Sequence, residues 1–369
     1  MIVGVLTSSR ADYGIYKPLL SLLKSDSSIE LKILAFGTHL SDKFGKTVNG
    51  IKDDGFIVTH EIETFPESDS PRDISVSMAK TIEKFSQIWE NESFDLVFAL
   101  GDRYEMFAAV ASTVPFNIPI AHIHGGETTL GAIDNAFRHS ITSMSSYHFT
   151  AAEPYKQRVI QILGHDNNVF NVGALSIDLL RNMVFLSQHE FNERYGIDIS
   201  KPTVLITFHP ETINFEENKK HIKELILVLT ELKNYQQVIT MPNADTMGQL
   251  IRESLLKYAK NKSWVFCVES FGSLGYLSCM KHCSFLLGNT SSGFIEASFF
   301  AKPVINLGCR QKGRIVTPNI FSVKIDHLTI KKTITLVEKT AIPSKKQVYG
   351  DGSAALQITT IIKKEFKTK

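Results

Sequence analysis

The chain has 369 residues, 43% of them hydrophobic, so it can form a large core, and its length predicts two domains rather than one. Its 40 lysines and arginines nearly balance its 38 aspartates and glutamates, which disfavours nucleic acid as a partner. No window approaches the ~20 apolar residues of a membrane helix. The start, MIVGVLTSSRAD, is typical of a buried strand rather than of a signal peptide, so we expect a cytoplasmic protein that binds no membrane.

The first half predicts a series of strands that alternate with helices, which is the pattern of a mostly parallel sheet covered on its faces. Strands are expected at residues 2–6, 31–36, 94–100, 118–123 and 147–150. An amphipathic helix is expected at residues 13–23, and another begins near Asp134. A short strand and a glycine near residues 169–176 lead into a polar helical stretch, and we place the domain junction at 172/173.

A second series of strands begins after Pro202. Its strands are expected at residues 204–208, 238–241, 264–268, 285–287 and 303–307, and residues 353–366 predict a closing helix. The fold class is therefore α/β, with two Rossmann-like domains facing a central cleft. We assign residues 1–172 to the first domain, 173–352 to the second, and 353–369 to a C-terminal helix that packs back on the first domain.

The cysteines Cys267, Cys279, Cys283 and Cys309 fit a reducing compartment better than a disulfide framework. Cys279 and Cys283 flank His282, which raises the possibility of a metal site. The surrounding YLSCMKHCSFLL, however, is typical of one helix face that runs into an apolar strand. We therefore expect these two thiols to be buried and structural, and we expect no metal.

Residues 121–139, AHIHGGETTLGAIDNAFRH, combine ionisable side chains with two adjacent glycines directly after a predicted strand. The titratable members are His122, His124, Glu127, Asp134 and His139. Carboxylates and imidazoles suit acid–base work, and Arg138 lies four residues after Asp134, where it can pair with that carboxylate. Zinc is disfavoured, because the segment has no HExxH pattern and no nearby cysteine. We expect one wall of an active site.

Two further strand ends in the first half carry polar groups. In TSSRADYG, Arg10 and the hydroxyls at a helix start favour anion binding, although helix capping by Ser9 or Asp12 explains the same pattern. In GDRYE, Gly101 allows a tight turn and Asp102 either caps the next helix or acts in the site. Neighbouring strand ends converge in such sheets, so we expect Asp102 close to the wall.

The second half supplies loops that suit a phosphate-bearing ligand. His209 follows a strand in TFHPET, and Asn243 does the same in PNADT. In GNTSSGFIE, a strand and a glycine precede three hydroxyl residues and a helix that carries Glu296 one turn inside. Such hydroxyls and backbone N–H groups can hold a pyrophosphate, while Glu296 accepts hydrogen bonds from a ribose. A capped helix is the alternative, and Arg310 and Arg314 in GCRQKGR are candidates to neutralise phosphates.

Together these motifs resemble the hydrolysing UDP-N-acetylglucosamine 2-epimerases of bacterial sialic acid biosynthesis. The resemblance runs nearly end to end, through TSSRADYG, GTHLSDKFG, GDRYE, HIHGGE, D-x3-RHSIT, TFHPET, PNADT, GNTSSGFIE and GCRQKGR. It implies a glycosyltransferase-B-like fold whose first domain holds the sugar and catalytic loops and whose second domain binds UDP. It also implies a homodimer or homotetramer that needs no cofactor.

The implied reaction begins when a base removes the proton on carbon 2 of the sugar and UDP leaves from carbon 1, giving a glycal. Water then adds at carbon 1 while carbon 2 is reprotonated on its other face, which gives N-acetylmannosamine and UDP. The resemblance implies that Asp102, Asp134 and His209 are catalytic. The implied substrate contacts are Arg10, His39, Arg103, Arg138, Asn243, Thr290, Ser291, Ser292, Glu296, Arg310 and Arg314.

One position departs from the family pattern. Many relatives have a catalytic glutamate where this chain has His124, so its role falls either to His124 or to Glu127, and both stay candidates. The substrate also stays open, because the hydrolysing 2-epimerases of UDP-N,N′-diacetylbacillosamine have very similar motifs. A retaining glycosyltransferase of the same fold is a more distant alternative, for which no acceptor signature is present. A silent sensor of UDP-sugars is disfavoured by the presence of Asp102, Asp134 and His209.

Overall fold

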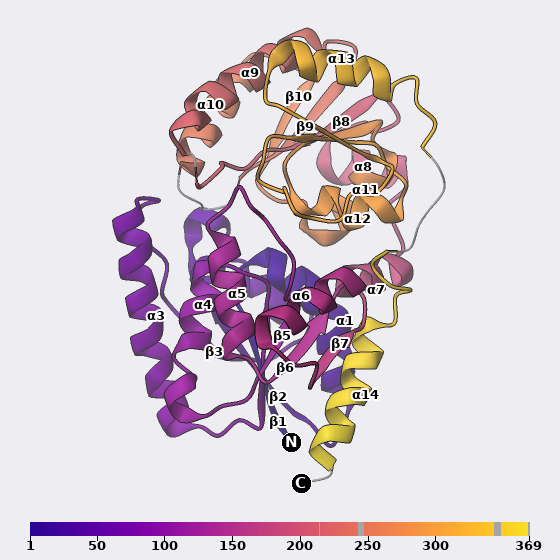
Figure 1. Ribbon diagram of the computed structural model, residues 1–369. Coiled ribbons are helices and arrows are strands. Elements are labelled where there is room, and N and C mark those ends of the chain that lie inside the picture. The colour runs from indigo at the N-terminus through magenta and orange to yellow at the C-terminus, as the bar shows by residue number, and fades with distance from the viewer. Residues whose placement is uncertain (214, 243–246, 343–347, 368–369) are drawn as a thin grey trace. The chain divides into compact units, whose positions relative to one another are not determined.

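The computed structural model describes residues 1–213, 215–242, 247–342 and 348–367 (Figure 1). The chain forms two compact units. The first comprises Met1–Glu127, Asp134–Arg181 and Val348–Lys369, and the second comprises Thr128–Ile133 and Asn182–Gln347. The sequence places the junctions at 172/173 and 352/353, whereas the units change at 181/182 and 347/348 and exchange one short segment, 128–133.

The first unit is built on a seven-stranded parallel sheet of order β3-β2-β1-β4-β5-β6-β7. Its strands are β1 (Ile2–Thr7), β2 (Glu30–Phe36), β3 (Val58–Ile62), β4 (Leu96–Leu100), β5 (Ile120–Ile123), β6 (Tyr147–Thr150) and β7 (Val169–Asn171). Its helices are α1 (Arg10–Ser25), α2 (Val48–Asp53), α3 (Pro71–Asn91), α4 (Tyr104–Ala111), α5 (Asp134–Met144), α6 (Glu153–Leu163), α7 (Leu175–Asn182) and α14 (Ala354–Lys367).

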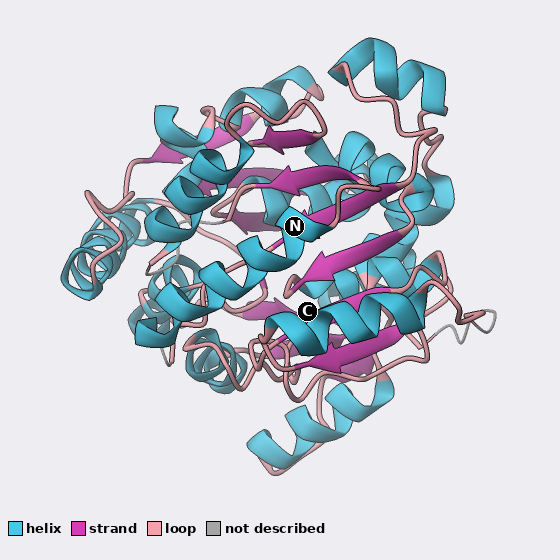
Figure 2. Cartoon of the chain, turned by 90° about the horizontal axis from the view of Figure 1, so that it is seen from above, coloured by secondary structure: helices cyan, strands magenta, loops and turns pink. Residues whose placement is uncertain are grey.

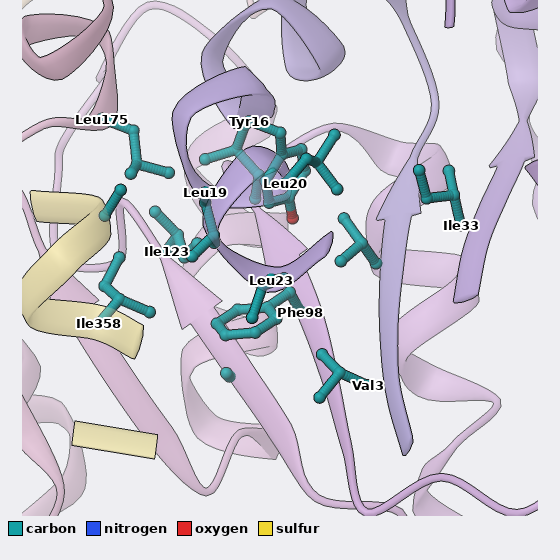
Figure 3. Close-up of a cluster of buried hydrophobic side chains, with 14 of the residues drawn as sticks. Val3, Tyr16, Leu19, Leu20, Leu23, Ile33, Phe98, Ile123, Leu175 and Ile358 are labelled. Carbon is teal, nitrogen blue, oxygen red and sulfur yellow. The ribbon is translucent and has the colours of Figure 1, made fainter. Parts of the chain in front are cut away.

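Helices cover both faces of this sheet, which is why β4 is apolar and buried at every position. Figure 2 shows the strands, in magenta, lying among the helices, in cyan. Side chains alternate along β1, so that Val3 and Val5 pack on α1 while Leu6 joins the opposite layer with Phe85 and Trp89 of α3. In the first layer, Leu19 and Leu23 lie over Phe98 of β4, and Ile358 of the yellow helix α14 completes the cluster (Figure 3).

The C-terminal helix α14 packs against α1 in the first unit. Its beginning is held by Asp178 of α7, whose carboxylate accepts hydrogen bonds from the backbone N–H groups of Ala354 (3.0 Å) and Ala355 (2.7 Å). An acidic group at a helix N-terminus satisfies free N–H groups and complements the helix dipole. Burial nevertheless raises the pKa of Asp178, because it disfavours the charged form.

The second unit has a six-stranded parallel sheet of order β10-β9-β8-β11-β12-β13. Its strands are β8 (Thr203–Thr207), β9 (Gln236–Thr240), β10 (Val265–Val268), β11 (Phe285–Gly288), β12 (Val304–Leu307) and β13 (Ile320–Val323). Its helices are α8 (Gln188–Tyr195), α9 (Asn218–Glu231), α10 (Gly248–Ala259), α11 (Gly272–His282), α12 (Glu296–Phe299) and α13 (His327–Val337). Strands β8, β9, β11 and β12 form its core with α9, α10 and α13.

The predicted class, an α/β protein of two Rossmann-like domains, is confirmed. The prediction for the thiols is also confirmed: Cys279 lies on α11, Cys283 follows its last residue, and both are buried. Burial raises the pKa of Cys283 to about 12, so this group stays a thiol at neutral pH. Among the described residues, no helix is long and apolar enough to cross a membrane.

Candidate functional site

The candidate site of the first unit lies where β1, β4 and β5 end. These strands are neighbours in the parallel sheet, so their carboxyl ends meet at one edge and the loops that follow them lie together. They lead into the TSSRADYG, GDRYE and HIHGGE motifs respectively. The edge therefore collects the groups in which sequence reasoning expected chemistry.

Arg138 of α5 is the central cation of this edge and is almost fully buried. One nitrogen of its guanidinium donates to the carboxylate of Asp102, and the other donates to the carbonyl of His124 at 2.9 Å and lies 3.7 Å from Glu127 Oε2. The predicted pairing of Arg138 with Asp134 is thus replaced by one with Asp102 and Glu127. The reason is burial: a buried guanidinium and the buried Glu127 each need an opposite charge, whereas Asp134 is partly exposed.

Asp102 acts in this ion pair rather than as a helix cap. Helix α4 has Arg103 at its N-cap position, with no side-chain capping bond. Arg103 in turn forms two hydrogen bonds with the fully buried Glu105, at 2.8 and 3.2 Å. Both predicted site residues of this loop are therefore oriented by buried partners of opposite charge.

His124 and Glu127 form a buried pair within the HIHGGE loop. His124 Nδ1 lies 2.6 Å from Glu127 Oε1, and the side chains are 7% and 1% exposed. His124 has a φ of +66°, a left-handed conformation that costs a non-glycine residue about 1–3 kcal/mol. Gly126 also has a positive φ, and a Cβ there would lie 2.2 Å from the carbonyl oxygen of Tyr155, so only glycine fits.

The other two histidines of the wall differ from His124. His122 Nε2 donates to the carbonyl of Gly101 at 2.8 Å, so its neutral ring accepts from Thr142 at Nδ1 (3.1 Å). Burial lowers its pKa to about 3, and its role is to join β5 to the loop that carries Asp102. His139 lies on α5, where burial and then the charge of Arg138 lower its pKa.

At the start of α1 the structure supports helix capping. Ser9 is the N-cap and accepts from the backbone N–H of Asp12, while the Asp12 carboxylate accepts from both the N–H (3.0 Å) and the hydroxyl (2.7 Å) of Ser8. Arg10 is the first residue of the helix and is partly exposed. The predicted residue His39 is fully buried between the hydroxyls of Thr7 and Thr47, at 2.9 and 2.8 Å, and burial lowers its pKa to about 4.

In the second unit, the side chain of Asn289 forms two hydrogen bonds with the backbone of His209, an arrangement that we call a clamp. Its Oδ1 accepts from the His209 N–H at 2.7 Å, and its Nδ2 donates to the His209 carbonyl at 2.8 Å. Gln311 donates to the carbonyl of Asn289 at 2.8 Å and accepts from Arg314 Nε at 2.6 Å. This chain of bonds connects the TFHPET, GNTSSGFIE and GCRQKGR loops. Sequence reasoning missed Asn289 and Gln311, although an asparagine directly after the strand-ending Gly288 was an available signal.

Glu211 is fixed by a second clamp of the same kind. The side chain of Asn218 accepts from the Glu211 N–H (3.0 Å) and donates to its carbonyl (2.8 Å). Glu211 Oε1 then accepts from the backbone N–H of Cys309 at 2.6 Å. The predicted phosphate ligand Arg310 is buried and donates to the carbonyl of Pro210 at 2.5 Å, so this arginine also braces the TFHPET loop.

The hydroxyl loop after β11 departs from the predicted helix. Residues Ser291–Gly293 form a 3-10 turn, and α12 begins only at Glu296, which is therefore its first residue and not one turn inside. Phe294 and Ile295 between them are buried, which holds this part of the chain against the core. The hydroxyls instead form a network: Ser292 lies 3.1 Å from Thr290 Oγ1 and 2.6 Å from the hydroxyl of Tyr276.

Tyr276, on α11, was not predicted, because nothing in its local sequence separates it from an ordinary core residue. Burial raises its pKa to about 12, so it stays a neutral hydrogen-bonding group. Ser291 is exposed at the surface of the turn. The predicted residue Asn243 lies outside the described part of the chain.

The wall at residues 121–139 is divided between the units. Its middle, Thr128–Ile133, belongs to the second unit: the Leu130 N–H donates to the carbonyl of Lys312 at 2.9 Å, and the Ile133 N–H donates to the hydroxyl of Thr212 at 3.0 Å. Glu127 is the residue before this segment, and Asp134, the first residue of α5, is the residue after it.

Two Rossmann-like units, with ionisable groups at the strand ends of one and hydroxyls, amides and arginines at those of the other, define an α/β protein of the Rossmann-like class. Residues 21–363 match the family model Epimerase_2, described as UDP-N-acetylglucosamine 2-epimerase, and the chain belongs to this family. The resemblance inferred from the motifs is thereby confirmed.

Individual relatives support the assignment. The chain is 38% identical to the GDP/UDP-N,N′-diacetylbacillosamine 2-epimerase (hydrolyzing) of Campylobacter jejuni, over 88% of this chain and 85% of that protein. It is 32% identical to the polysialic acid biosynthesis protein P7 of Escherichia coli, over 99% and 94%. The crystal structure of UDP-GlcNAc 2-epimerase from Neisseria meningitidis bound to UDP-GlcNAc has the same fold, with a TM-score of 0.84 at 19% identity, covering 99% and 100% of the two chains.

Proposed function

We propose that this chain is a hydrolysing 2-epimerase that converts UDP-N-acetylglucosamine to N-acetylmannosamine and UDP. Family membership supports the epimerase chemistry, and relatives over 30% identical, named as hydrolysing, support the release of UDP. The observation that carries the proposal is the cluster of the buried residues His124, Glu127 and Arg138 with the partly exposed Asp102 at the strand ends of the first unit.

The proposed reaction needs two proton transfers at carbon 2 of the sugar. The groups that we propose for them are Asp102, His124, Glu127, Asp134 and His209. Removal of the proton expels UDP from carbon 1 and gives a glycal, to which water then adds while carbon 2 is protonated on its other face. Acid–base groups of this kind contribute about 10²–10⁴-fold each to such steps.

The loops of the second unit would hold the UDP portion. Thr290, Ser291 and Ser292 offer hydroxyls, and Arg310 and Arg314 offer charge for the diphosphate as its C–O bond breaks. Glu296 would accept hydrogen bonds from the ribose. The remaining proposed contacts are Arg10, His39, Arg103, Arg138 and Asn243.

A second candidate is the same reaction on UDP-N,N′-diacetylbacillosamine. It is favoured by the names of two relatives: the Campylobacter jejuni protein and the UDP-N,N′-diacetylbacillosamine 2-epimerase (hydrolyzing) of Legionella pneumophila, which is 32% identical over 97% of this chain. The two candidates differ in the groups on carbons 4 and 6 of the sugar and share every bond change.

The test is to incubate the protein with each nucleotide sugar in deuterated water. We expect free UDP and a 2-epimerised sugar with deuterium at carbon 2, measured by NMR and mass spectrometry. UDP release without deuterium at carbon 2 would exclude elimination and favour simple hydrolysis. An epimerised sugar still attached to UDP would show a non-hydrolysing enzyme, and the faster of the two substrates identifies the natural class.

A further inference from the structure

We infer that His124 is the proton acceptor of the epimerisation, acting through Nε2, and that Glu127 is a positioning residue that acts through His124. This inference rests on the proposed 2-epimerase activity and assigns the step that the sequence leaves open between these two residues. It is carried by the hydrogen bonds of the imidazole, by its backbone, and by the partners of the competing groups.

The bonding of the ring fixes its reactive atom. Arg138 Nη1 lies 3.7 Å from Glu127 Oε2 and favours the ionised carboxylate, which can only accept hydrogen bonds. His124 Nδ1, 2.6 Å from Glu127 Oε1, must therefore carry the proton, so the lone pair of the neutral ring is on Nε2. Nε2 is buried, and among the described residues it has no hydrogen-bond partner. A buried polar atom of this kind calls for an explanation, and a role in binding or catalysis is one that fits its place at the strand ends.

The backbone of His124 adopts a left-handed conformation, which costs conformational energy, and this conformation positions the ring. Its φ of +66° is less favourable for histidine than for glycine, and both backbone groups are bonded: the N–H donates to Phe149 O at 3.0 Å, and the carbonyl accepts from Arg138 at 2.9 Å. Strain that surrounding structure maintains in this way is concentrated at functional sites. The charged or titratable groups near the ring are Glu127 from its own loop, Arg138 from α5 and His122 from β5.

Four titratable groups close to His124 in the first unit are already engaged by other partners or disfavour a proton, namely Glu127, Asp102, His122 and His139. Glu127 is almost fully buried and has one oxygen on His124 and the other beside Arg138. The carboxylate of Asp102 is engaged in the ion pair with Arg138. Both ring nitrogens of His122 are bonded, and burial, followed by the charges of Arg138 and Arg158, lowers the pKa of His139.

The step balances as follows. The Nε2 lone pair takes the proton from carbon 2, and the electron pair of that C–H bond becomes the double bond between carbons 1 and 2. The bond from carbon 1 to the diphosphate oxygen breaks, and its electron pair leaves with UDP. The imidazolium is neutralised by Glu127 until its proton passes to solvent, and a different group protonates carbon 2 on the opposite face.

The central test compares His124→Gln and His124→Gly with the wild-type enzyme. We expect both to release UDP at least about 10²-fold more slowly, while UDP binding, measured by calorimetry, stays within threefold. Added imidazole should restore part of the activity of His124→Gly, whose backbone tolerates the positive φ. The control is His60→Gln: His60 Nε2 lies 2.5 Å from Glu92 Oε1 in a partly exposed His–Glu pair outside the site, and its loss should change turnover less than twofold.

A second measurement tests the positioning role of Glu127. Glu127→Gln can still accept from Nδ1 but carries no charge to stabilise the imidazolium, so the acidic limb of the kcat/KM profile should move to lower pH and kcat should fall about 10-fold. Glu127→Asp should restore part of kcat and part of the position of the acidic limb, and Glu92→Gln should change neither quantity. A purely structural role would lower activity equally at every pH.

Several results would overturn the inference. One is turnover of His124→Gln within a few-fold of the wild-type rate. Another is that His124→Gln releases UDP at the wild-type rate but accumulates the glycal, because this would place His124 in the addition of water and not in the removal of the proton. If His124→Gln no longer binds UDP, two other results test the inference: the rescue of His124→Gly by imidazole and the shifted pH profile of Glu127→Gln. If neither is observed, the inference is rejected. Failure of the proposed function is distinguishable, because the wild-type enzyme itself would then release no UDP.

Discussion

The strand ends of the two units are built from different chemistry. In the first unit they carry buried ionisable groups, with Arg138 between Asp102 and Glu127, and the imidazole of His124 held by a carboxylate. In the second unit neutral amides organise the loops, since Asn289 and Asn218 clamp backbone segments by two hydrogen bonds each. The first arrangement suits the movement of protons, and the second suits a rigid support for a bound ligand.

This difference implies that the first unit carries the proton transfers and the second unit binds the nucleotide, which variants can test. Changes in the first unit should remove turnover and spare nucleotide binding, and changes in the second should weaken nucleotide binding. A result in which both units respond alike would break the comparison.

The largest effect is expected from Asp134→Asn in the first unit. Loss of the carboxylate removes a proposed acid–base group at the start of α5, so kcat should fall about 10²–10⁴-fold while UDP binds as tightly as before. Steady-state kinetics and calorimetry measure the two quantities. Asp166→Asn, an exposed aspartate of the same unit, is the control, and turnover of Asp134→Asn within a few-fold of wild type would reject the catalytic role.

An intermediate effect is expected from Asn289→Ala in the second unit. The change leaves the backbone groups of His209 without two hydrogen bonds and should lower the free energy of unfolding by about 1–3 kcal/mol. UDP binding should weaken about tenfold, because three loops lose their common anchor. Urea unfolding and calorimetry are the measurements, with the exposed Asn192→Ala as control. Unchanged UDP affinity would show that the clamp does not shape the cradle.

The last prediction concerns the pH dependence of stability and belongs to the first unit. Burial lowers the pKa of His39 and His148 to about 4 and that of His122 to about 3, so the folded state keeps them neutral. Below about pH 6.5 the unfolded chain binds their protons and the folded chain does not, so stability falls as the pH falls from about 6.5 towards 4. Each histidine contributes about 1.4 kcal/mol per pH unit in that window.

Urea unfolding between pH 7 and 4.5 measures this slope. His148→Gln should reduce the change of unfolding free energy per pH unit by the contribution of one histidine. His189→Gln, at an exposed position on α8, should leave this slope unchanged. A slope that is the same in His148→Gln and the wild type would contradict the assignment.

The central strands could be predicted because they are buried on both faces and therefore read as apolar runs. The missed strands β3 and β13 lie at sheet edges, where exposed residues such as Glu61 and Ser322 interrupt the apolar pattern. Local spacing also predicted the start of α5. The other two edge strands, β7 and β10, keep short apolar runs and were predicted.

The sequence predicted which residues gather at the site, but not which of them form ion pairs and hydrogen bonds with one another. Motif order brought Asp102, His124 and Glu127 to one sheet edge, yet the partner of Arg138 was misassigned, because the helical neighbour Asp134 is local while Asp102 is 36 residues away. The Asn289 clamp spans 80 residues and was missed for the same reason. Burial decides between such partners, and burial is a property of the fold.

The exchanged segment Thr128–Ile133 has a practical consequence for dissecting the protein. The chain passes between the units at 127/128, 133/134, 181/182 and 347/348, so no single cut separates them. Residues 182–347 expressed alone would lack the strip that covers the backbone of Cys309 and Arg310, where Gly131 sits so close that a Cβ would lie 2.6 Å from those atoms. A self-standing second unit would need that strip grafted back through a new loop.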